Sequence, residues 1–308
     1  MNDISDAESD DLIRLVTSNA DISSQYVIFQ NGKGEYFVIN VAKVEELIVY
    51  KDMYKVDTTD IYGLIEGTAK VREHMMSIVN LDRWLGIDEL PKSEYELAMI
   101  CNYAGTRVAM IIKNVYGVVN IEPSQMYDDS HKDEKISYLT ELTIDGKKLL
   151  AKVFNSDLFI HDVMPNKYEK ELAKVDEYAD LKDIIKKRVL LAEDSQLMQE
   201  AIERLLDNMD IDYVAYDNGK LLYDSLEKED LENIGLIITD IEMPVMGGLE
   251  LIKLCKENEL YKDIPIVVNT NMSNIGIVNS ADKLGAKEVL KKLDLDALRD
   301  VIIKYAGE

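Results

Sequence analysis

The chain has 308 residues, with 35 Lys and Arg against 59 Asp and Glu, so its formal net charge is −24 at pH 7. The length suits two domains of ordinary size, and a hydrophobic content of 47% supports folded cores rather than wholesale disorder. The acidic excess argues against a protein that mainly binds nucleic acid or an anionic membrane, because attraction to phosphates needs a basic face.

Residues 1–20 lack the marks of a targeting segment. A signal peptide needs a basic start and an apolar core, whereas this segment begins MNDISDAESDD. The chain also has no run of about 18 apolar residues that could form a transmembrane helix. We therefore expect a cytoplasmic protein without membrane insertion, in which residues 1–20 form an N-terminal segment.

Residues 21–165 have the pattern of an all-β domain. Short runs rich in β-branched and aromatic residues recur, among them QYVIFQ, EYFVINV, MMSIVNL, YELAMICNYA, TRVAMIIKNV and KKLLAKVF. Glycine-containing turn signals separate them, which favours a barrel or sandwich. The run VAKVEELIVY has apolar residues at helical spacing, so we expect one small helix there. We expect Trp84 in the core, and Cys101 as a buried free thiol, like Cys255 further on.

This first region contains no recognisable catalytic motif. It has no nucleophile elbow, HExxH motif, P-loop or dinucleotide fingerprint. We therefore interpret it as a binding module rather than an enzyme.

Residues 166–187 have the pattern of a charged amphipathic helix. The segment lacks glycine, and its apolar residues recur every three or four positions. We expect a helical linker, whose apolar stripe has to pack on a domain of the chain or on a second copy. The stripe comprises Tyr168, Leu172, Val175, Tyr178, Leu181 and Ile185.

Residues 188–308 alternate between strand and helix patterns, with five of each. Continuous apolar strands such as 234–238 indicate a parallel sheet covered on both faces. We therefore expect a doubly wound α/β domain. Ligands of such sheets bind at the carboxyl ends of the strands.

Polar side chains follow these strands at that edge, where Glu193, Asp194, Asp240, Thr270 and Lys292 should converge. Clustered carboxylates repel one another, and a hard divalent cation such as Mg²⁺ removes that repulsion. Asp194 and Asp240 suit direct ligation, and Glu193 suits a water-mediated contact. A site with Mg²⁺, carboxylates, a hydroxyl and an ammonium suits phosphoryl transfer, with an aspartate as the nucleophile.

The segments LLAEDS, IITDIEMPVMGG, PIVVNT and GAKEVLKK resemble the response-regulator receiver domains. The resemblance implies a flavodoxin-like fold with strand order 2-1-3-4-5. It implies phosphorylation at Asp240, a switch hydroxyl on Thr270 and a phosphate-sensing ammonium on Lys292. The implied metal ligands are Glu193, Asp194, Asp240 and the backbone carbonyl of Glu242. The chain departs from the family pattern at Leu293, where proline is usual, and at Val289, where an aromatic residue is common.

Residues 21–165 resemble CheW-like coupling domains in the segments GLIEGTAKVREHMMSIVNLDRWLGI, ELAMICNYAGTRVAMIIKNVYGVVNIEPSQM and SYLTELTIDGKKLLAKVFNSDLFI. The family fold is a pair of five-stranded, SH3-like β-barrels that bridges chemoreceptor tips and the CheA histidine kinase. Arg72 occupies the basic position of the family's Leu-Arg-Gly motif and would be a partner contact, whereas Glu73 replaces its glycine.

A CheW-like domain followed by a receiver is similar to the CheV-type chemotaxis coupling proteins. This resemblance implies a signalling protein, not an enzyme, that couples receptors to CheA and takes a phosphoryl group from the kinase. Phosphorylation would regulate coupling, or the receiver would act as a phosphate sink. Such a protein would be recruited to membrane-associated receptor arrays.

Two alternatives are weaker. A phosphatase of the haloacid-dehalogenase type needs D-x-D-x-T after a strand, but the run from Asp240 is DIEMP. A transcriptional regulator needs a basic DNA-binding module, and the sequence has none beside the receiver.

Overall fold

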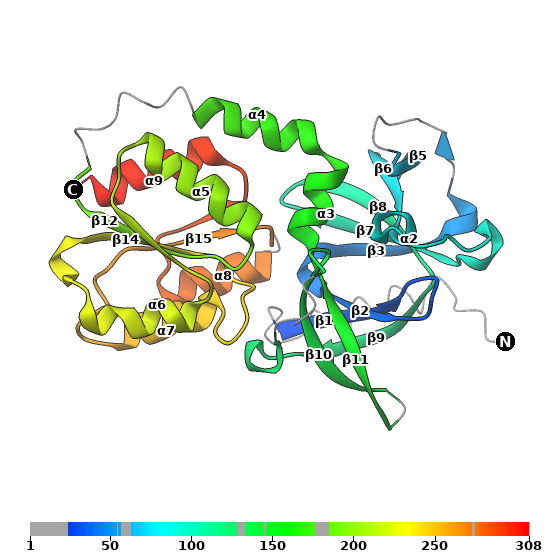
Figure 1. Cartoon of the computed structure of the whole chain (residues 1–308), viewed down its shortest axis with the longest axis horizontal. Coiled ribbons are helices and arrows are strands. Elements are labelled where there is room, and N and C mark those ends of the chain that lie inside the picture. The colour runs from blue at the N-terminus through cyan, green and yellow to red at the C-terminus, as the bar shows by residue number, and fades with distance from the viewer. Residues whose placement is uncertain are drawn as a thin grey trace. The chain divides into compact units, whose positions relative to one another are not determined.

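The computed structural model describes residues 24–53, 55–56, 63–127, 133–144, 146–175, 185–272 and 275–307. The chain divides into two compact units, one ending at Phe159 and the other beginning at Ile160, with Pro123–Tyr127 grouped with the second (Figure 1). The expected N-terminal segment at 1–20 lies outside the described residues. Within the described part of the chain, no helix combines the length and apolar character that a membrane-spanning helix needs.

One sheet of the first unit has five strands. They are β1 (Gln25–Gln30), β2 (Tyr36–Asn40), β9 (Asn114–Asn120), β10 (Ile136–Ile144) and β11 (Lys147–Phe154). Their order is β10-β11-β2-β1-β9. The interior strand β1, whose sequence is QYVIFQ, is buried along its whole length and pairs antiparallel with β2 and β9. Its β-branched and aromatic residues suit this position between two neighbours.

The other sheet of the first unit has six strands. They are β3 (Val44–Val49), β4 (Lys55–Val56), β5 (Ile65–Val71), β6 (His74–Asn80), β7 (Leu97–Tyr103) and β8 (Thr106–Ile112). Their order is β3-β7-β8-β6-β5-β4. The resemblance predicts five strands per barrel, and the two-residue strand β4 on the edge is the difference.

Residues 41–50 do not form the predicted helix. A short 3₁₀ turn at Val41–Lys43 is followed by β3, which pairs antiparallel with β7. The prediction is wrong because apolar residues three or four apart fit a helix but do not require one, and a neighbouring strand supplies all the pairing that β3 needs.

Two helices complete the aromatic core of this unit, namely α2 (Leu81–Leu85) and the first half of α3 (Ser156–Val163). Trp84 is 1% exposed, and its ring lies 5.1 Å from that of Phe154 and 5.2 Å from that of Phe159. Trp84 is therefore a core residue, as the sequence predicts. Cys101 and Cys255 are both buried and free, as predicted.

The second unit contains a five-stranded sheet in which all neighbours are parallel. Its strands are β12 (Arg188–Ala192), β13 (Tyr213–Tyr216), β14 (Ile234–Thr239), β15 (Ile266–Thr270) and β16 (Glu288–Lys291). The order β13-β12-β14-β15-β16 confirms the predicted 2-1-3-4-5 arrangement. β14 is fully buried, as expected for a sheet covered on both faces.

Five helices cover this sheet. They are α5 (Gln196–Asn208), α6 (Gly219–Ser225), α7 (Gly248–Glu257), α8 (Ile275–Leu284) and α9 (Leu295–Ala306). Figure 1 shows α5 and α9 on one face and α6 and α7 on the other. Apolar residues of α5 and α9 form one buried cluster with β12 and β14.

The region predicted to be a helical linker, residues 166–187, is described in part. Helix α4 spans Pro165–Val175, and residues 176–184 lie outside the described part of the chain. The apolar stripe of α4 packs within the second unit, where Val175 is fully buried in the cluster beneath α5 and α9. The stripe therefore has its partner within the chain.

Candidate functional site

The carboxyl ends of four parallel strands bring the predicted site residues to one edge of the sheet. Glu193 directly follows β12, Asp240 follows β14, Thr270 ends β15 and Lys292 follows β16. Because β14 lies between β12 and β15, Asp240 occupies the centre of this edge. All four residues are buried, with exposed fractions of 5% or less.

Three carboxylates meet at this edge. Glu193, Asp194 and Asp240 each offer an oxygen, and these oxygens lie within 4.8 Å of one another. Such a set of hard oxygen donors fits Mg²⁺, which binds through one or two carboxylates and keeps several waters. The Ser195 backbone N–H donates to Glu193 Oε1 at 3.1 Å, and the Ile241 N–H donates to Asp240 Oδ1 at 2.6 Å, so both carboxylates are held in place.

Lys292 neutralises part of this negative charge. Its Nζ lies 2.9 Å from Asp240 Oδ2 and 2.9 Å from Glu193 Oε1, and its side chain is only 2% exposed. The ammonium therefore connects two buried carboxylates from different strands. A buried cation in this position also stabilises any further negative charge that is added to Asp240.

Thr270 and Lys292 are linked through the backbone. The Lys292 N–H donates to the Thr270 carbonyl oxygen at 3.1 Å, and the Thr270 hydroxyl accepts from the Met272 N–H at 3.2 Å. This second bond fixes the start of the loop that follows β15.

The two glycines after Asp240 are explained by close backbone contact. A Cβ on Gly248 would lie 2.0 Å from the Asp240 carbonyl oxygen, and a Cβ on Gly247 would lie 2.5 Å from that of Ile241. Any side chain here would displace the Asp240 backbone. The motif therefore positions the central carboxylate.

The remaining receiver residues named by the resemblance lie nearby in the chain. Glu242 follows Asp240 by two residues in the same loop, and the role of its carbonyl as a metal ligand stays a prediction, as do the roles of the other site residues. Leu293 follows Lys292 with φ +65°, and no cis peptide bond occurs in the described ranges.

Arg72 belongs to the first unit. It forms the turn between β5 and β6 with φ +52°, and its side chain is 73% exposed. Its Nη2 donates to Glu46 Oε1 on β3 at 2.8 Å. Arg72 is thus both paired with a carboxylate and accessible to a partner.

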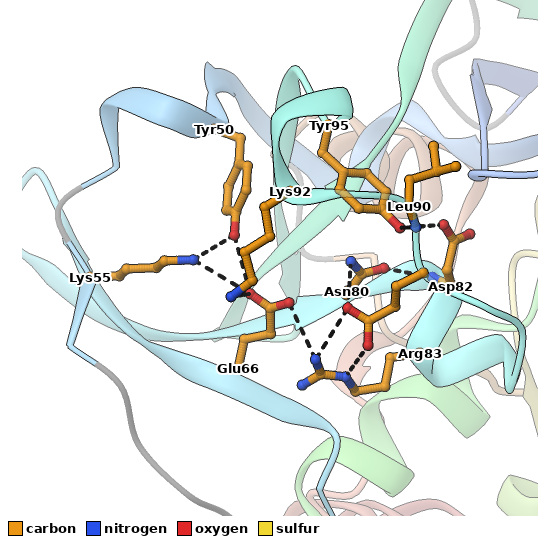
Figure 2. Close-up of polar contacts among 10 residues, drawn as sticks. Tyr50, Lys55, Glu66, Asn80, Asp82, Arg83, Leu90, Lys92 and Tyr95 are labelled. Atoms are coloured by element: carbon orange, nitrogen blue, oxygen red, sulfur yellow. Dashed lines mark hydrogen bonds and ion pairs between the residues drawn. The ribbon is translucent and has the colours of Figure 1, made fainter.

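The same unit also contains a polar network that no sequence pattern indicates, shown in Figure 2. Its first centre is Glu66 on β5, whose side chain is 3% exposed. Glu66 lies 3.4 to 3.7 Å from the cationic groups of Lys55, Arg83 and Lys92, and it accepts from the Tyr50 hydroxyl at 3.1 Å. These contacts join β4, β5, α2 and the loop before β7.

The second centre of this network is Asp82, which is fully buried at the start of α2. It accepts from the Gly32 N–H at 2.8 Å. It also accepts from the Tyr95 hydroxyl at 2.5 Å, and that hydroxyl accepts from the Leu90 N–H (Figure 2). Burial and the bond to Asp82 raise the pKa of Tyr95 to about 12. The contacts are structural, because they tie the β1–β2 loop and the connection before β7 to one helix.

Comparison with known proteins finds one protein family that matches the first unit and another that matches the second. The CheW-like domain family matches residues 25–163, and the response regulator receiver domain family matches residues 189–303. The chain is 27% identical to the chemotaxis protein CheV1 of Helicobacter pylori, over 91% of this chain and 92% of that protein. It is 22% identical to CheV2 of the same organism, over 88% and 90%.

The second unit also has relatives of its own. The CheY homolog of Campylobacter jejuni is 32% identical over 39% of this chain and 96% of that protein. The parallel sheet with its acidic edge is therefore a response-regulator receiver domain, and it follows a CheW-like domain. The chain as a whole joins these two domains, and over about nine-tenths of its length it is similar to the chemotaxis proteins CheV1 and CheV2.

Proposed function

We propose that this protein couples chemoreceptor tips to a CheA-type histidine kinase through its CheW-like domain, and that phosphorylation of Asp240 regulates this coupling. The observation that carries the proposal is the buried contact of Lys292 with both Asp240 and Glu193. An ammonium in this place suits a carboxylate that changes its charge reversibly.

In the proposed reaction, an Asp240 carboxylate oxygen attacks the phosphorus atom of a kinase phosphohistidine. The new O–P bond forms as the P–N bond breaks, and the electron pair of that bond stays on the imidazole nitrogen. Asp240 becomes an acyl phosphate, which carries a charge of roughly −1.5 to −2 where the carboxylate carried −1. Lys292 then contacts the phosphoryl oxygens, and the Thr270 hydroxyl approaches them.

The three carboxylates Glu193, Asp194 and Asp240, with the Glu242 carbonyl, would hold a Mg²⁺ ion. When bound, the ion neutralises charge that spreads over the phosphoryl oxygens. Asp194 is partly exposed and suits the open side of the site, whereas Glu193 is held by the Ser195 N–H and by Lys292. This donor set supports Mg²⁺ over a transition metal that prefers nitrogen or sulfur.

The CheW-like domain would supply the partner surface. Arg72 is exposed at a hairpin tip and is held in one orientation by Glu46, which suits a contact with the kinase or the receptor tips. Binding of this kind would recruit the protein to membrane-associated receptor arrays. The chain then acts as a scaffold with a phosphoacceptor rather than as a turnover enzyme.

The proposal is tested by reconstituting receptor, kinase and this protein, and by measuring kinase activity before and after phosphotransfer. We expect activity to change when Asp240 carries the phosphoryl group, and to stay constant in Asp240→Asn. Asp263→Asn, a change at an exposed turn residue, is the matched control. If phosphotransfer occurs and kinase activity is unchanged, the receiver is a phosphate sink and regulation of coupling is refuted.

A further inference from the structure

Leu293 adopts a backbone conformation that its side chain disfavours. Its φ of +65° lies in the left-handed region, where glycine is the favoured residue. A branched aliphatic residue persists there only if its surroundings hold it. The position is notable because Leu293 directly follows Lys292, whose ammonium contacts Asp240.

The side chain of Leu293 accounts for this conformation. It packs against a small cluster, here called the Tyr168 cluster. This cluster comprises buried Tyr168, Met198 and Ala201 with partly buried Leu172, Leu197 and Leu293. Tyr168 and Leu172 belong to α4, so Leu293 connects the turn beside the phosphoacceptor with the linker helix.

Helix α4 contacts the rest of the second unit near both of its ends. Near its start, the Tyr168 hydroxyl donates to the Leu197 carbonyl oxygen at 2.9 Å. Near its end, Lys174 Nζ lies 3.0 Å from Asp296 on α9, and Val175 is fully buried. The first attachment is the one that Leu293 touches.

The turn that contains Leu293 is fixed on both sides. Before it, the Lys292 N–H is bonded to Thr270. After it, Asp294 caps α9 by accepting from the Ala297 N–H at 3.1 Å. Leu293 is the one residue between these two backbone attachments, so a backbone adjustment that accompanies movement of the Lys292 side chain is taken up at Leu293, because the cap resists movement on the other side.

Resting on the function proposed above, we propose that Leu293 is a positioning residue that couples the phosphoryl group on Asp240 to the docking of α4. A phosphoryl group attracts the Lys292 ammonium away from Glu193, because it adds charge and three acceptor oxygens. The movement withdraws Leu293 from the Tyr168 cluster. Helix α4 then loosens at its first attachment, and the state of the receiver reaches the chain segment that leads back to the CheW-like domain.

Amide hydrogen exchange of the full-length chain tests this coupling. Exchange is measured in peptides covering 165–175, with and without a small acyl-phosphate donor and Mg²⁺, and intact mass reports the phosphoryl group. We expect exchange in α4 to accelerate at least about fivefold on phosphorylation, the lower end of typical coupling between linked sites. In Leu293→Ala we expect the phosphoryl group to be retained and the acceleration to be lost.

Two further variants complete the test. Leu293→Gly suits the left-handed backbone and removes the same contacts, so it should lose the acceleration even if Leu293→Ala folds poorly. Leu260→Ala, at a leucine that is 70% exposed in the same unit, should respond like the wild type. A full response in folded Leu293→Gly overturns the proposal, as does a phosphorylated wild type whose α4 exchange is unchanged. Absence of phosphorylation in the wild type would refute the proposed function and the coupling together.

Discussion

Lys292 Nζ lies 2.9 Å from Asp240 Oδ2, so the residue after β16 holds the carboxylate that follows β14. The same ammonium lies 2.9 Å from Glu193, and the carboxylate of Asp194 completes the acidic group. The proposed phosphoacceptor is therefore surrounded by one cation and two further carboxylates. We expect the balance of charge among these groups to affect both the free energy of unfolding and the phosphorylation of Asp240.

Replacing Lys292 with methionine removes this cation and leaves two buried carboxylates facing each other. Without Mg²⁺, we expect the free energy of unfolding to fall by about 3–5 kcal/mol, the usual cost of breaking a buried ion pair. Mg²⁺ should recover part of this loss. Denaturant unfolding with and without Mg²⁺ measures both effects. Lys291→Met, at the exposed neighbouring residue, is the control, and an equal loss in both variants would contradict the account.

Mg²⁺ should stabilise the wild-type chain. At a concentration 100 times its dissociation constant, we expect about 2.7 kcal/mol of added stability. Asp194→Asn removes one ligand charge and should weaken this effect, because the cation then offsets less repulsion. Thermal unfolding across a Mg²⁺ titration provides the measurement. Asp263→Asn is the control and should respond to Mg²⁺ like the wild type. The proposed metal site would be wrong if Asp194→Asn did so as well.

Gly248→Ala should disturb the phosphoacceptor directly. The new Cβ would lie 2.0 Å from the Asp240 carbonyl oxygen, so the backbone has to move. We expect a loss of at least about 1–3 kcal/mol in the free energy of unfolding, as for overpacked cores, and slower phosphorylation.

Gly146→Ala separates backbone strain from collision. Gly146 has φ +74° with no atom near its Cβ position, so the change should cost about 1 kcal/mol through strain alone. Phosphorylation at the wild-type rate in Gly248→Ala would contradict the positioning role of Gly248.

Arg72 should matter more for binding than for folding. Its ion pair with Glu46 is largely exposed, and such pairs contribute only about 0–1 kcal/mol. Arg72→Glu should therefore weaken binding to the kinase or the receptor tips with little loss of stability. The double swap Glu46→Arg with Arg72→Glu restores the pair but not the charge at the hairpin tip, so binding should stay weak. Recovery of binding in the double swap would show that only the pair matters.

The two cysteines should resist thiol reagents in the native state. Burial raises the pKa of Cys101 and of Cys255 to about 12, so both stay protonated near neutral pH. The folded state holds these thiol protons more tightly than the unfolded state does. Their contribution to the free energy of unfolding is therefore fully present below the unfolded pKa of about 8.5 and is lost as the pH rises toward 12. Labelling at pH 8 should be complete only after denaturation. Rapid native labelling would contradict the burial of these thiols.

The receiver was predictable because its pattern is simple. Apolar strands alternate with amphipathic helices. Parallel strands then place Asp240, Thr270 and Lys292 at one edge of the sheet, independently of the conformation of the loops. The approximate strands of the first unit were predictable for a similar reason. Arg72 is predictable as a contact residue because it occupies the basic position of a family motif.

Other features depend on contacts that no local pattern reports. Glu66 and Asp82 acquire their partners from four separate segments, so the sequence gives no sign that they are buried. The strand β3 depends on its pairing with β7, whereas its own apolar spacing predicts a helix. The apolar stripe of α4 was visible, but its partner and the conformation of Leu293 follow from tertiary packing.

Covalent labelling of Asp240 is the most direct test of the central claim. The wild-type chain is incubated with phosphorylated kinase and Mg²⁺, and the modified residue is identified by reductive trapping and peptide mass analysis. The account predicts one acyl phosphate, on Asp240, that forms neither in Asp240→Asn nor when Mg²⁺ is chelated. A phosphoryl group on another residue, or undiminished labelling of Asp240→Asn, would contradict it.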